Sequence, residues 1–170
     1  IEIGTLADLR EAYQWLSSSS EASGFQSVAL DSISEVAEVV LQHELKRNKD
    51  GRAAYGEMNT LMQELIRSFR DLPKHVYMSA KLEKSQDEMG KILYNPSMPG
   101  KTLTQGLPYF FDEVLAMRVE KDAEGNSQRA LLCDGDGLWL AKDRSGKLER
   151  WEVPDLGAVI CKIGGNHANA

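Results

Sequence analysis

Several signals that would assign a function directly are missing from this 170-residue sequence. Its two cysteines, Cys133 and Cys161, lack CxxC spacing, and its three histidines, His43, His75 and His167, show no metal-ligand spacing. We therefore predict no zinc site. We expect two buried, reduced thiols, as in a cytosolic protein, with a disulfide as the alternative. No apolar run approaches the roughly 18 residues of a membrane span, and no secretory leader is visible, so we predict no membrane partner.

The chain is also short of positive charge. It has 20 Lys and Arg against 26 Asp and Glu, a formal net charge of -6. This balance argues against a protein that coats nucleic acid over its whole surface. It still permits binding through a few basic loops, because the potential that matters is local. An apolar content of 42% and a charged content of 27% are typical of a globular protein, and the length favours a single domain.

Hydrophobic periodicity predicts that strands and helices alternate in the first half of the chain. Thr5, with Asp8 three residues later, forms a capping box for the first helix. Residues 26–30 form a nearly continuous apolar run, as expected for a parallel strand that is buried on both faces. The predicted elements are a strand end at 1–3, a helix from 6, a strand at 26–30, helices over 33–41 and 54–69, and a strand at 75–80.

The second half predicts a different architecture. Residues 81–108 show no sustained period, and we expect a long loop that is functional, disordered or both. Residues 124–126 are a hairpin turn signal. Asp134–Gly137 superficially resembles a calcium loop but lacks the later bidentate Glu, so we expect a turn. The predicted strands lie at 113–119, 129–133, 138–141, 151–153 and 159–163. Strand–helix units followed by hairpins indicate an α/β domain with a mixed sheet.

Asp31 is the strongest single candidate for chemistry. It ends the apolar run and is followed by Ser32, and the carboxyl end of a buried strand is where open α/β sheets bind ligands. This is the pattern of a Walker B strand, whose carboxylate holds Mg²⁺ directly or through water. The following hydroxyl can then bond a coordinated water. The alternative is structural, because Asp31 and Ser32 also precede a helix that they can cap.

Two cations near the C-terminus form a second candidate. Lys142 and Arg144 are two residues apart, so on an extended segment both point to the same side. There they can converge on one phosphate, which Arg binds bidentately and Lys as a point charge. An exposed polar turn is the alternative. Lys81, directly after the predicted strand at 75–80, is a third candidate that can sense a γ-phosphate, and a solvated lysine is its alternative.

Two segments have the composition of nucleic-acid-binding loops. The first is the basic connection between the two central helices, and the second combines cations with an aromatic ring that can stack on a base. Acidic residues dilute the second segment, and solvated or disordered surface is the alternative for both. The candidate residues are Lys46, Arg47, Lys49 and Arg52 in the first segment and Lys84, Lys91, Tyr94 and Lys101 in the second.

The order of these elements resembles the RecA-like P-loop ATPase core. More specifically, the chain resembles small phage nucleotide-binding (AAA-domain) proteins, whose members with assigned roles are single-strand annealing recombinases. The similarity runs from Thr5 to Ile163 and includes the stretches 99–101, 111–114 and 141–146. It implies a RecA-like mixed, mainly parallel sheet flanked by helices, with C-terminal antiparallel hairpins, in one domain over residues 1–170.

The resemblance also implies a function. It implies an ATP-dependent recombination or annealing ATPase, phage-encoded and so in the bacterial host cytoplasm, that binds single-stranded DNA and forms a filament or ring. Nucleotide then lies between subunits: Asp31 and Ser32 serve the Mg²⁺ of one subunit, and Lys142 and Arg144 act on the ATP of its neighbour. The alternatives are a non-hydrolytic DNA-binding module in which nucleotide gates assembly, and a ring helicase motor.

One part of this pattern is missing from the sequence. No Gly-x-x-x-x-Gly-Lys-Ser/Thr loop occurs in these residues, and the chain begins at Ile1 without a methionine. We therefore expect a fragment that lacks its N-terminal phosphate-binding portion. Such a fragment alone should bind ATP weakly or not at all.

Overall fold

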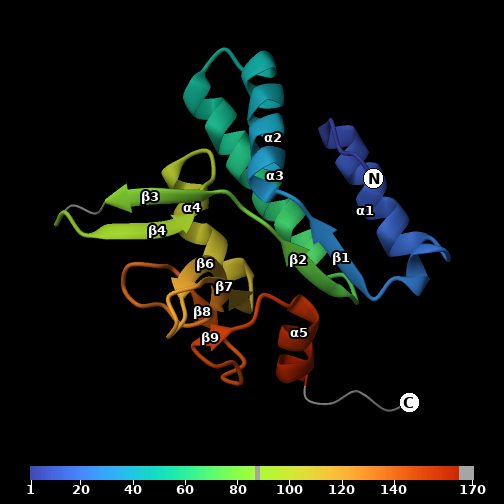
Figure 1. Cartoon of the computed structure of the whole chain (residues 1–170). Helices are drawn as coiled ribbons and strands as arrows, with labels where there is room; N and C mark the ends of the chain where they lie inside the picture. Colours follow the sequence, from blue (N-terminus) through green and yellow to red (C-terminus); the bar gives the residue numbers. More distant parts are fainter. Residues whose placement is uncertain (87–88, 165–170) are drawn as a thin grey trace. The chain divides into compact units, whose positions relative to one another are not determined.

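The computed structural model describes residues 1–86 and 89–164, which belong to two units. Unit 1 contains residues 1–83 and 96–110, and unit 2 contains residues 84–95 and the chain from Phe111 onward. The chain passes between the units within one pair of strands, β3 (Leu82–Gln86) and β4 (Ile92–Pro96) (Figure 1). The assignment of the whole chain to one ATPase domain stays a prediction.

Unit 1 is mainly helical, with one pair of parallel strands. The strands β1 and β2 pair from Ser27↔His75 to Leu30↔Met78, and the two long helices α2 and α3 connect them. Its elements are α1 (Leu6–Ser18), η1 (Ala22–Gly24), β1 (Ser27–Leu30), α2 (Ile33–Arg47), α3 (Gly51–Arg70), β2 (His75–Met78), α4 (Lys101–Gly106) and η2 (Leu107–Phe110).

The first helix begins at its capping box. Thr5 Oγ1 accepts a hydrogen bond from the Asp8 N–H at 3.2 Å, and Asp8 Oδ2 accepts one from the Thr5 N–H at 2.7 Å. Both bonds satisfy N–H groups that have no partner inside the helix, and the predicted capping box is confirmed. The predicted strand end is wrong, because residues 1–3 are in no strand.

The core of unit 1 forms where α2 and α3 pack together. Five side chains of α3, spaced three or four residues apart, are at most 2% exposed: Ala54, Met58, Met62, Ile66 and Phe69. Full burial of a large apolar side chain stabilises a fold by roughly 1.5–3 kcal/mol. This stripe therefore holds α3 in place, as its helical period predicts.

Strand β1 differs from its prediction. In β1 only Leu30 is buried, Val28 is half-buried, and Ser27 and Ala29 are exposed. In the described part of the chain β1 pairs only with β2, so it lies at an edge of its sheet. The prediction of a strand buried on both faces is therefore wrong.

Residues 81–108 are not a long loop. Their described residues form β3, β4, α4 and η2. Residues of β3 alternate between exposed and half-buried, which is the two-residue period of a strand at the surface. The proline and glycine that suggested a loop mark element ends: Pro96 ends β4, and Gly100, with φ of 84°, precedes α4.

Unit 2 is built on antiparallel strands. A hairpin joins β6 and β7, which pair from Ala116↔Leu132 to Lys121↔Ser127, and β9 pairs with the other edge of β7. The short strands β5 and β8 form a separate antiparallel pair. The elements of unit 2 are β5 (Glu113–Val114), β6 (Ala116–Lys121), β7 (Ser127–Leu132), β8 (Lys142–Asp143), β9 (Trp151–Glu152) and α5 (Leu156–Gly164).

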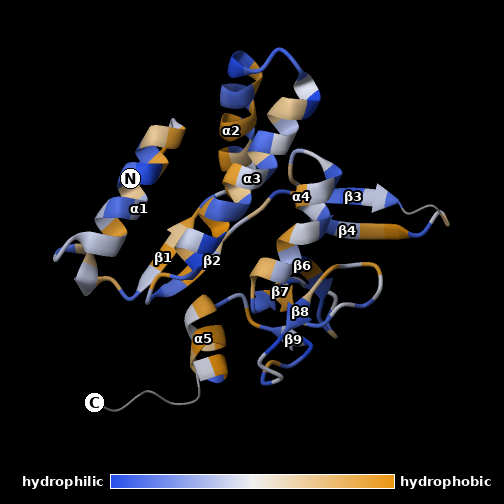
Figure 2. Cartoon of the chain, turned by 180° about the vertical axis from the view of Figure 1, so that it is seen from behind, coloured by the Kyte–Doolittle hydropathy of each residue, from blue (hydrophilic) through white to orange (hydrophobic). Residues whose placement is uncertain are grey.

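Two predicted strands of unit 2 are wrong. Residues 138–141 form only an isolated bridge at Trp139, and residues 159–163 belong to helix α5. The apolar residues of α5 recur at positions 156, 159, 160 and 163, which is helical spacing, and much of the α5 ribbon has the hydrophobic colour in Figure 2. Val159 and Ile163 pack on Leu131 and Cys133 in the core of unit 2.

The described residues thus form a mixed α/β chain with five α-helices and mostly antiparallel strand pairs. The predicted α/β class and the C-terminal antiparallel hairpin are confirmed, and the mainly parallel RecA-like core is not. No described helix is long and apolar enough to cross a membrane.

The two thiols are free but differ in exposure. Cys133 is buried, as predicted, and burial raises the pKa of its thiol to about 11. Cys161 is exposed, so the prediction of two buried thiols is wrong for this residue. The helix α5 places Cys161 two residues after the buried Val159, on a different side of the helix.

Candidate functional site

The carboxyl ends of β1 and β2 bring polar side chains together in unit 1. Asp31 directly follows β1, and Ser79 directly follows β2. The Ser79 hydroxyl donates a hydrogen bond to Asp31 Oδ1, and the Ser79 N–H donates to the Leu30 carbonyl at 3.0 Å. Asp31 is exposed, so its carboxylate is held from one side and open to solvent from another.

Ser32 takes the structural role that its sequence position allows. It is the N-cap of α2, and its Oγ accepts a hydrogen bond from the Glu35 N–H at 3.3 Å. Asp31 precedes this cap, and the peptide bond that joins the two residues is cis. The helix-cap interpretation therefore holds for Ser32 and leaves Asp31 available for another role.

Lys81 lies at the same end of the strand pair. Its Nζ is 2.9 Å from Glu35 Oε2 in the first turn of α2, and this hydrogen bond, together with the charge of Glu35, raises the pKa of Lys81. Its backbone N–H donates to Ser34 Oγ at 2.9 Å, and Ser34 Oγ donates to the Ser97 carbonyl at 2.6 Å. Because Ser34 is buried, these bonds fix the backbone at Lys81.

The structure therefore places three of the predicted residues, Asp31, Ser32 and Lys81, at the same end of the strand pair β1–β2. It adds Glu35 and Ser79, which sequence reasoning missed. Glu35 stands three residues after Ser32, the spacing of a capping box, and Ser79 ends the strand that neighbours Asp31. These two positions are the signals that could have identified them.

A cleft of about 580 Å³ opens beside these residues within unit 1. Its walls come from α1, β1 and α2, and are mainly apolar, with Trp15, Leu16 and Val36 among them. Asp31, Ser32 and Glu35 also line it.

These residues fit one part of a nucleotide site. Mg²⁺ in such sites is usually bound through one or two carboxylates together with substrate phosphates, and the exposed Asp31 can supply such a ligand. The described residues contain no group of three or more His, Cys, Asp or Glu that could hold a metal alone. His167 lies outside the described residues. Since no phosphate-binding loop occurs in the sequence, the residues present fit the metal side of the site and not a phosphate cradle.

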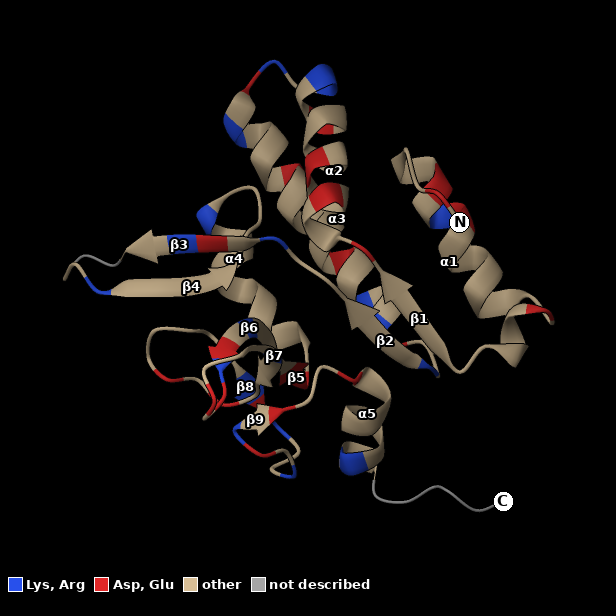
Figure 3. Ribbon diagram, in the orientation of Figure 1, with Lys and Arg blue, Asp and Glu red and all other residues tan. Residues whose placement is uncertain are grey.

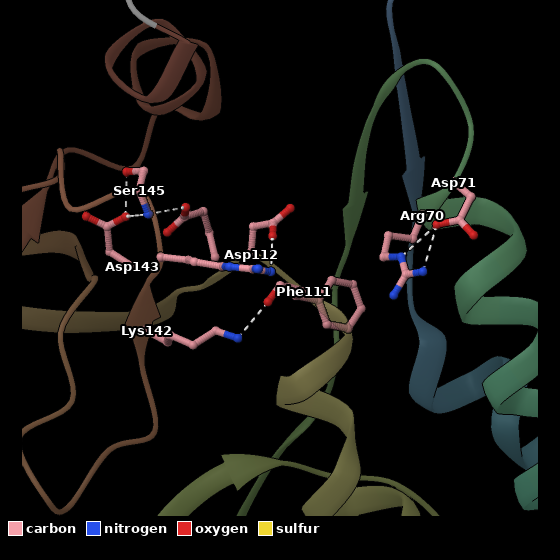
Figure 4. A network of polar contacts seen from close by, with 9 residues as sticks. Arg70, Asp71, Phe111, Asp112, Lys142, Asp143 and Ser145 are labelled. Carbon is pink, nitrogen blue, oxygen red and sulfur yellow. Dashed lines mark hydrogen bonds and ion pairs between the residues drawn. The ribbon is translucent and has the colours of Figure 1, made fainter.

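Lys142 and Arg144 lie in unit 2, on and directly after β8 (Figure 4). The Lys142 Nζ donates to the Phe111 carbonyl at 2.6 Å. Arg144 Nη1 is 3.0 Å from Asp112 Oδ1, and these two side chains are 74% and 73% exposed. Both cations thus contact one short segment, residues 111–112, and their convergence on a phosphate stays a prediction.

Asp143, the residue between them, organises the turn that follows. Its Oδ1 accepts hydrogen bonds from the Ser145 N–H at 2.8 Å and hydroxyl at 2.6 Å and from the Gly146 N–H at 3.1 Å. Its Oδ2 accepts one from the Leu148 N–H at 2.8 Å. Burial pushes the pKa of Asp143 up, but these bonds and one to Glu113 outweigh it and lower the pKa to about 2. The sequence Asp-x-Ser-Gly is the local signal for such a turn.

The nucleic-acid candidates fall into both units. Lys46 and Arg47 are in the last turn of α2, Lys49 is in the connection and Arg52 is in the first turn of α3, so all four surround one helix–helix turn of unit 1 (Figure 3). All four are exposed. Arg47 also lies 3.5 Å from the buried Glu44.

The second group is divided. Lys101 begins α4 in unit 1, and Lys84, Lys91 and Tyr94 belong to unit 2. Tyr94 stacks on Trp139, with 4.5 Å between ring centroids and 16° between planes, so one face of its ring is covered. Neither unit alone therefore contains all four residues of this second candidate group.

Comparison with protein families adds the class of protein. Residues 1–145 match the model of an AAA domain, and this stretch includes Asp31, Lys81, Lys142 and Arg144. The match covers most of the chain, so the chain belongs to this AAA-domain family, which is of the P-loop ATPase type and implies nucleotide binding. Neither a curated protein nor a solved structure matches the chain.

Proposed function

We propose that this chain is part of a RecA-like ATPase that works on single-stranded DNA and binds ATP between subunits. The observation that carries the proposal is the meeting of Asp31, Ser32 and Lys81 at the carboxyl ends of two parallel strands, beside a cleft, in an AAA-domain chain. Ligands of open α/β sheets bind at this end. A recombination or annealing role, a phage origin and a location in the bacterial host cytoplasm belong to the same proposal.

Each of these three residues has a role that follows from its position. Asp31, oriented by the Ser79 hydroxyl, would hold Mg²⁺, which would supply positive charge next to the phosphates. Ser32 fixes the start of α2 next to Asp31. Lys81 follows β2, the strand that pairs with β1, and senses the γ-phosphate from this position.

Arg144 and Lys142 act on the nucleotide of an adjoining subunit. An exposed ion pair contributes about 0–1 kcal/mol, so a phosphate can replace Asp112 as the partner of Arg144 at little cost. Lys142 is half-buried and donates to the Phe111 carbonyl, so it offers a point charge from a fixed position. A filament or ring in which subunits share sites follows from this division.

The catalytic test is ATP hydrolysis by the complete gene product. Arg144→Ala should lower DNA-stimulated turnover by roughly 10³-fold or more and leave ATP binding largely intact, as expected for an arginine finger. Arg150→Ala, which removes an exposed arginine from the same unit, is the control and should keep full activity. Normal turnover of the Arg144 variant would refute its catalytic role.

Mixing subunits tests whether Arg144 acts across an interface. Asp31→Asn and Arg144→Ala subunits should each be inactive alone. In mixed oligomers some interfaces combine an intact Asp31 with an intact Arg144, so part of the activity should return. If mixing restores nothing while both variants still assemble, the nucleotide is not shared between subunits.

The DNA part of the proposal depends on the exposed cations around the α2–α3 turn. Binding of single strands should weaken with salt, and each lost phosphate contact should reduce the slope of log affinity against log salt by about 0.7. A triple variant with Lys46→Gln, Lys49→Gln and Arg52→Gln should therefore reduce this slope by about 2. A control that removes three exposed cations of unit 2, Lys121, Arg129 and Arg150, should leave the slope unchanged.

Two alternatives make different predictions. A non-hydrolytic annealing module, favoured by the absence of a phosphate-binding loop from the sequence, should anneal strands equally well with a non-hydrolysable ATP analogue. A ring helicase should unwind duplex DNA, and an annealing protein should not. Absence of DNA binding at low salt with nucleotide present would contradict all three.

A further inference from the structure

We propose that Glu113 is a positioning residue for Arg144, because it binds Asp143 as a neutral acid and holds the turn from which Arg144 projects. The two carboxyl groups share one proton across the strand pair β5–β8. This inference rests on the proposed role of Arg144. It assigns a role to a residue for which the sequence analysis gave none.

The register of the strands brings the two acids together. Glu113 and Asp143 are direct partners in the antiparallel pair of β5 and β8. Side chains of directly opposed residues are neighbours on one face of a sheet, and like charges there are destabilising. Two ionised carboxylates in this position would repel each other, so a proton on one of the two stabilises the pair.

The hydrogen bonds show which acid is ionised. Asp143 accepts bonds on both oxygens, from three backbone N–H groups and the Ser145 hydroxyl, and four donors favour the ionised form of the acceptor. The carboxyl group of Glu113 accepts fewer hydrogen bonds than that of Asp143. Its Oε1 accepts from the Ser145 N–H at 3.3 Å, and its Oε2 is buried with no hydrogen-bond donor among the described residues.

A proton on Glu113 removes this deficit. An unsatisfied buried acceptor is destabilising, whereas a protonated Oε2 becomes a donor to the Asp143 carboxylate. Burial raises the pKa of Glu113 to about 7, and the hydrogen bond to Asp143 and the charge of Asp143 add to it. The N–H groups of Ser145 and Arg144 oppose this rise.

Other charged groups nearby have their own partners. Arg144 pairs with Asp112, Lys142 donates to the Phe111 carbonyl, and Lys162 bonds Glu152 at 2.7 Å. Glu152 lies close enough to act electrostatically on Asp143, and the buried Cys133 stays neutral well above pH 7. Glu113 is therefore the group of this cluster that changes charge near neutral pH.

The consequence concerns Arg144. The N–H groups that bind Asp143 and Glu113 belong to Ser145, Gly146 and Leu148, so the acid pair ties down the backbone that directly follows Arg144. Loss of the shared proton as the pH rises through about 7 places two like charges opposite each other and loosens this turn. A repulsion of about 0.2–1 kcal/mol changes an equilibrium by up to about 5-fold.

The first test follows the proton itself in the full chain and needs no ATP. Carbon NMR of labelled glutamate carboxyl groups should give Glu113 an apparent pKa of about 7, with the amides of Ser145, Gly146 and Leu148 shifting at the same pH. Glu113→Gln keeps the shape and can donate an N–H to Asp143, so in this variant the amides should not shift near pH 7. A Glu113 titration near 4.5, its usual value, would overturn the proposal.

The second test connects the pair to turnover. Wild-type kcat should fall by up to about 5-fold as the pH rises from 6 to 8.5, and Glu113→Gln should remove this fall. Glu113→Ala, which cannot donate, should be impaired at every pH. Glu124→Gln, the same change in the exposed β6–β7 turn, is the control and should keep the wild-type profile.

The two tests separate this inference from the proposed function. If Glu113 titrates near 7 but Arg144→Ala keeps full turnover, the catalytic role of Arg144 fails and the acid pair remains. If Arg144→Ala is inactive but Glu113→Gln keeps the wild-type pH profile, the proposed function stands and the positioning role of Glu113 fails.

Discussion

Arg118 offers the sharpest test of the packing in unit 2. Its guanidinium lies between two indole rings, 4.9 Å from the centroid of Trp139 and 5.1 Å from that of Trp151. It also lies 2.7 Å from Glu120 and 3.1 Å from Asp136, and its side chain is only 22% exposed. The strand β6, the turn at Asp136 and the strand β9 therefore all meet at this one side chain.

The expected loss can be estimated for two substitutions. Each cation–π contact contributes about 0.5–1 kcal/mol, and the ion pairs together add about 1 kcal/mol. Arg118→Ala should therefore lower the free energy of unfolding of unit 2 by about 2–3 kcal/mol. Arg118→Lys keeps the charge but not the flat group that stacks between two rings, so it should lose about 1–2 kcal/mol.

Urea unfolding followed by tryptophan fluorescence measures these losses. In a Trp15→Phe background the two remaining tryptophans, Trp139 and Trp151, both report on unit 2. Arg129→Lys, at an exposed position of β7, is the matched control and should change stability by less than about 0.5 kcal/mol. If Arg118→Lys were equally neutral, the stacked arrangement would contribute nothing and the reasoning would be refuted.

Other predictions concern pH, the core and the candidate site. The pKa of Glu113 is raised from 4.5 to about 7, so its stabilising proton is present below pH 4.5 and lost as the pH rises through 7. Relative to Glu113→Gln, the wild type should lose about 1–2 kcal/mol over this window, after allowance for solvent screening, in urea curves at pH 4.5 and 8. Met62→Ala, at a fully buried position, should cost about 2–5 kcal/mol by calorimetry, and a loss below 1 kcal/mol would contradict the α2–α3 core. In the complete gene product, Ser79→Ala should weaken binding of Mg-ATP by roughly 3- to 10-fold in titration calorimetry, because Asp31 loses its hydrogen bond. Ser23→Ala is the control, and equal affinities would show that Ser79 does not orient Asp31.

Local signals predicted local structure well. The Thr5–Asp8 capping box, the apolar stripe of α3 and the hairpin turn near Gly125 each depend on residues within a few positions of one another. The same kind of signal failed for α5, because a short apolar run suits a buried strand as well as a helix. The helical spacing of the apolar residues at 156, 159, 160 and 163, together with the packing of Val159 and Ile163 on the core of unit 2, decides in favour of the helix.

The candidate site shows the same division. Asp31 and Lys81 were predictable because the carboxyl ends of strands are where such chains place polar residues. Glu35 and Ser79 were not singled out, since their importance depends on which side chains they meet. The pairing of Arg144 with Asp112 was also beyond reach, because 32 positions separate these residues.

The sequence by itself determined the mixed α/β class, the starts of α1 and α2 and the polar residues that follow β1 and β2, because short-range hydrogen bonds and hydrophobic period decide these features. Tertiary structure alone decided that β1 is an edge strand, that residues 81–108 are largely ordered and that Glu113 opposes Asp143. The physical reason is that strand register and burial depend on contacts between segments far apart in the chain, which no local pattern specifies.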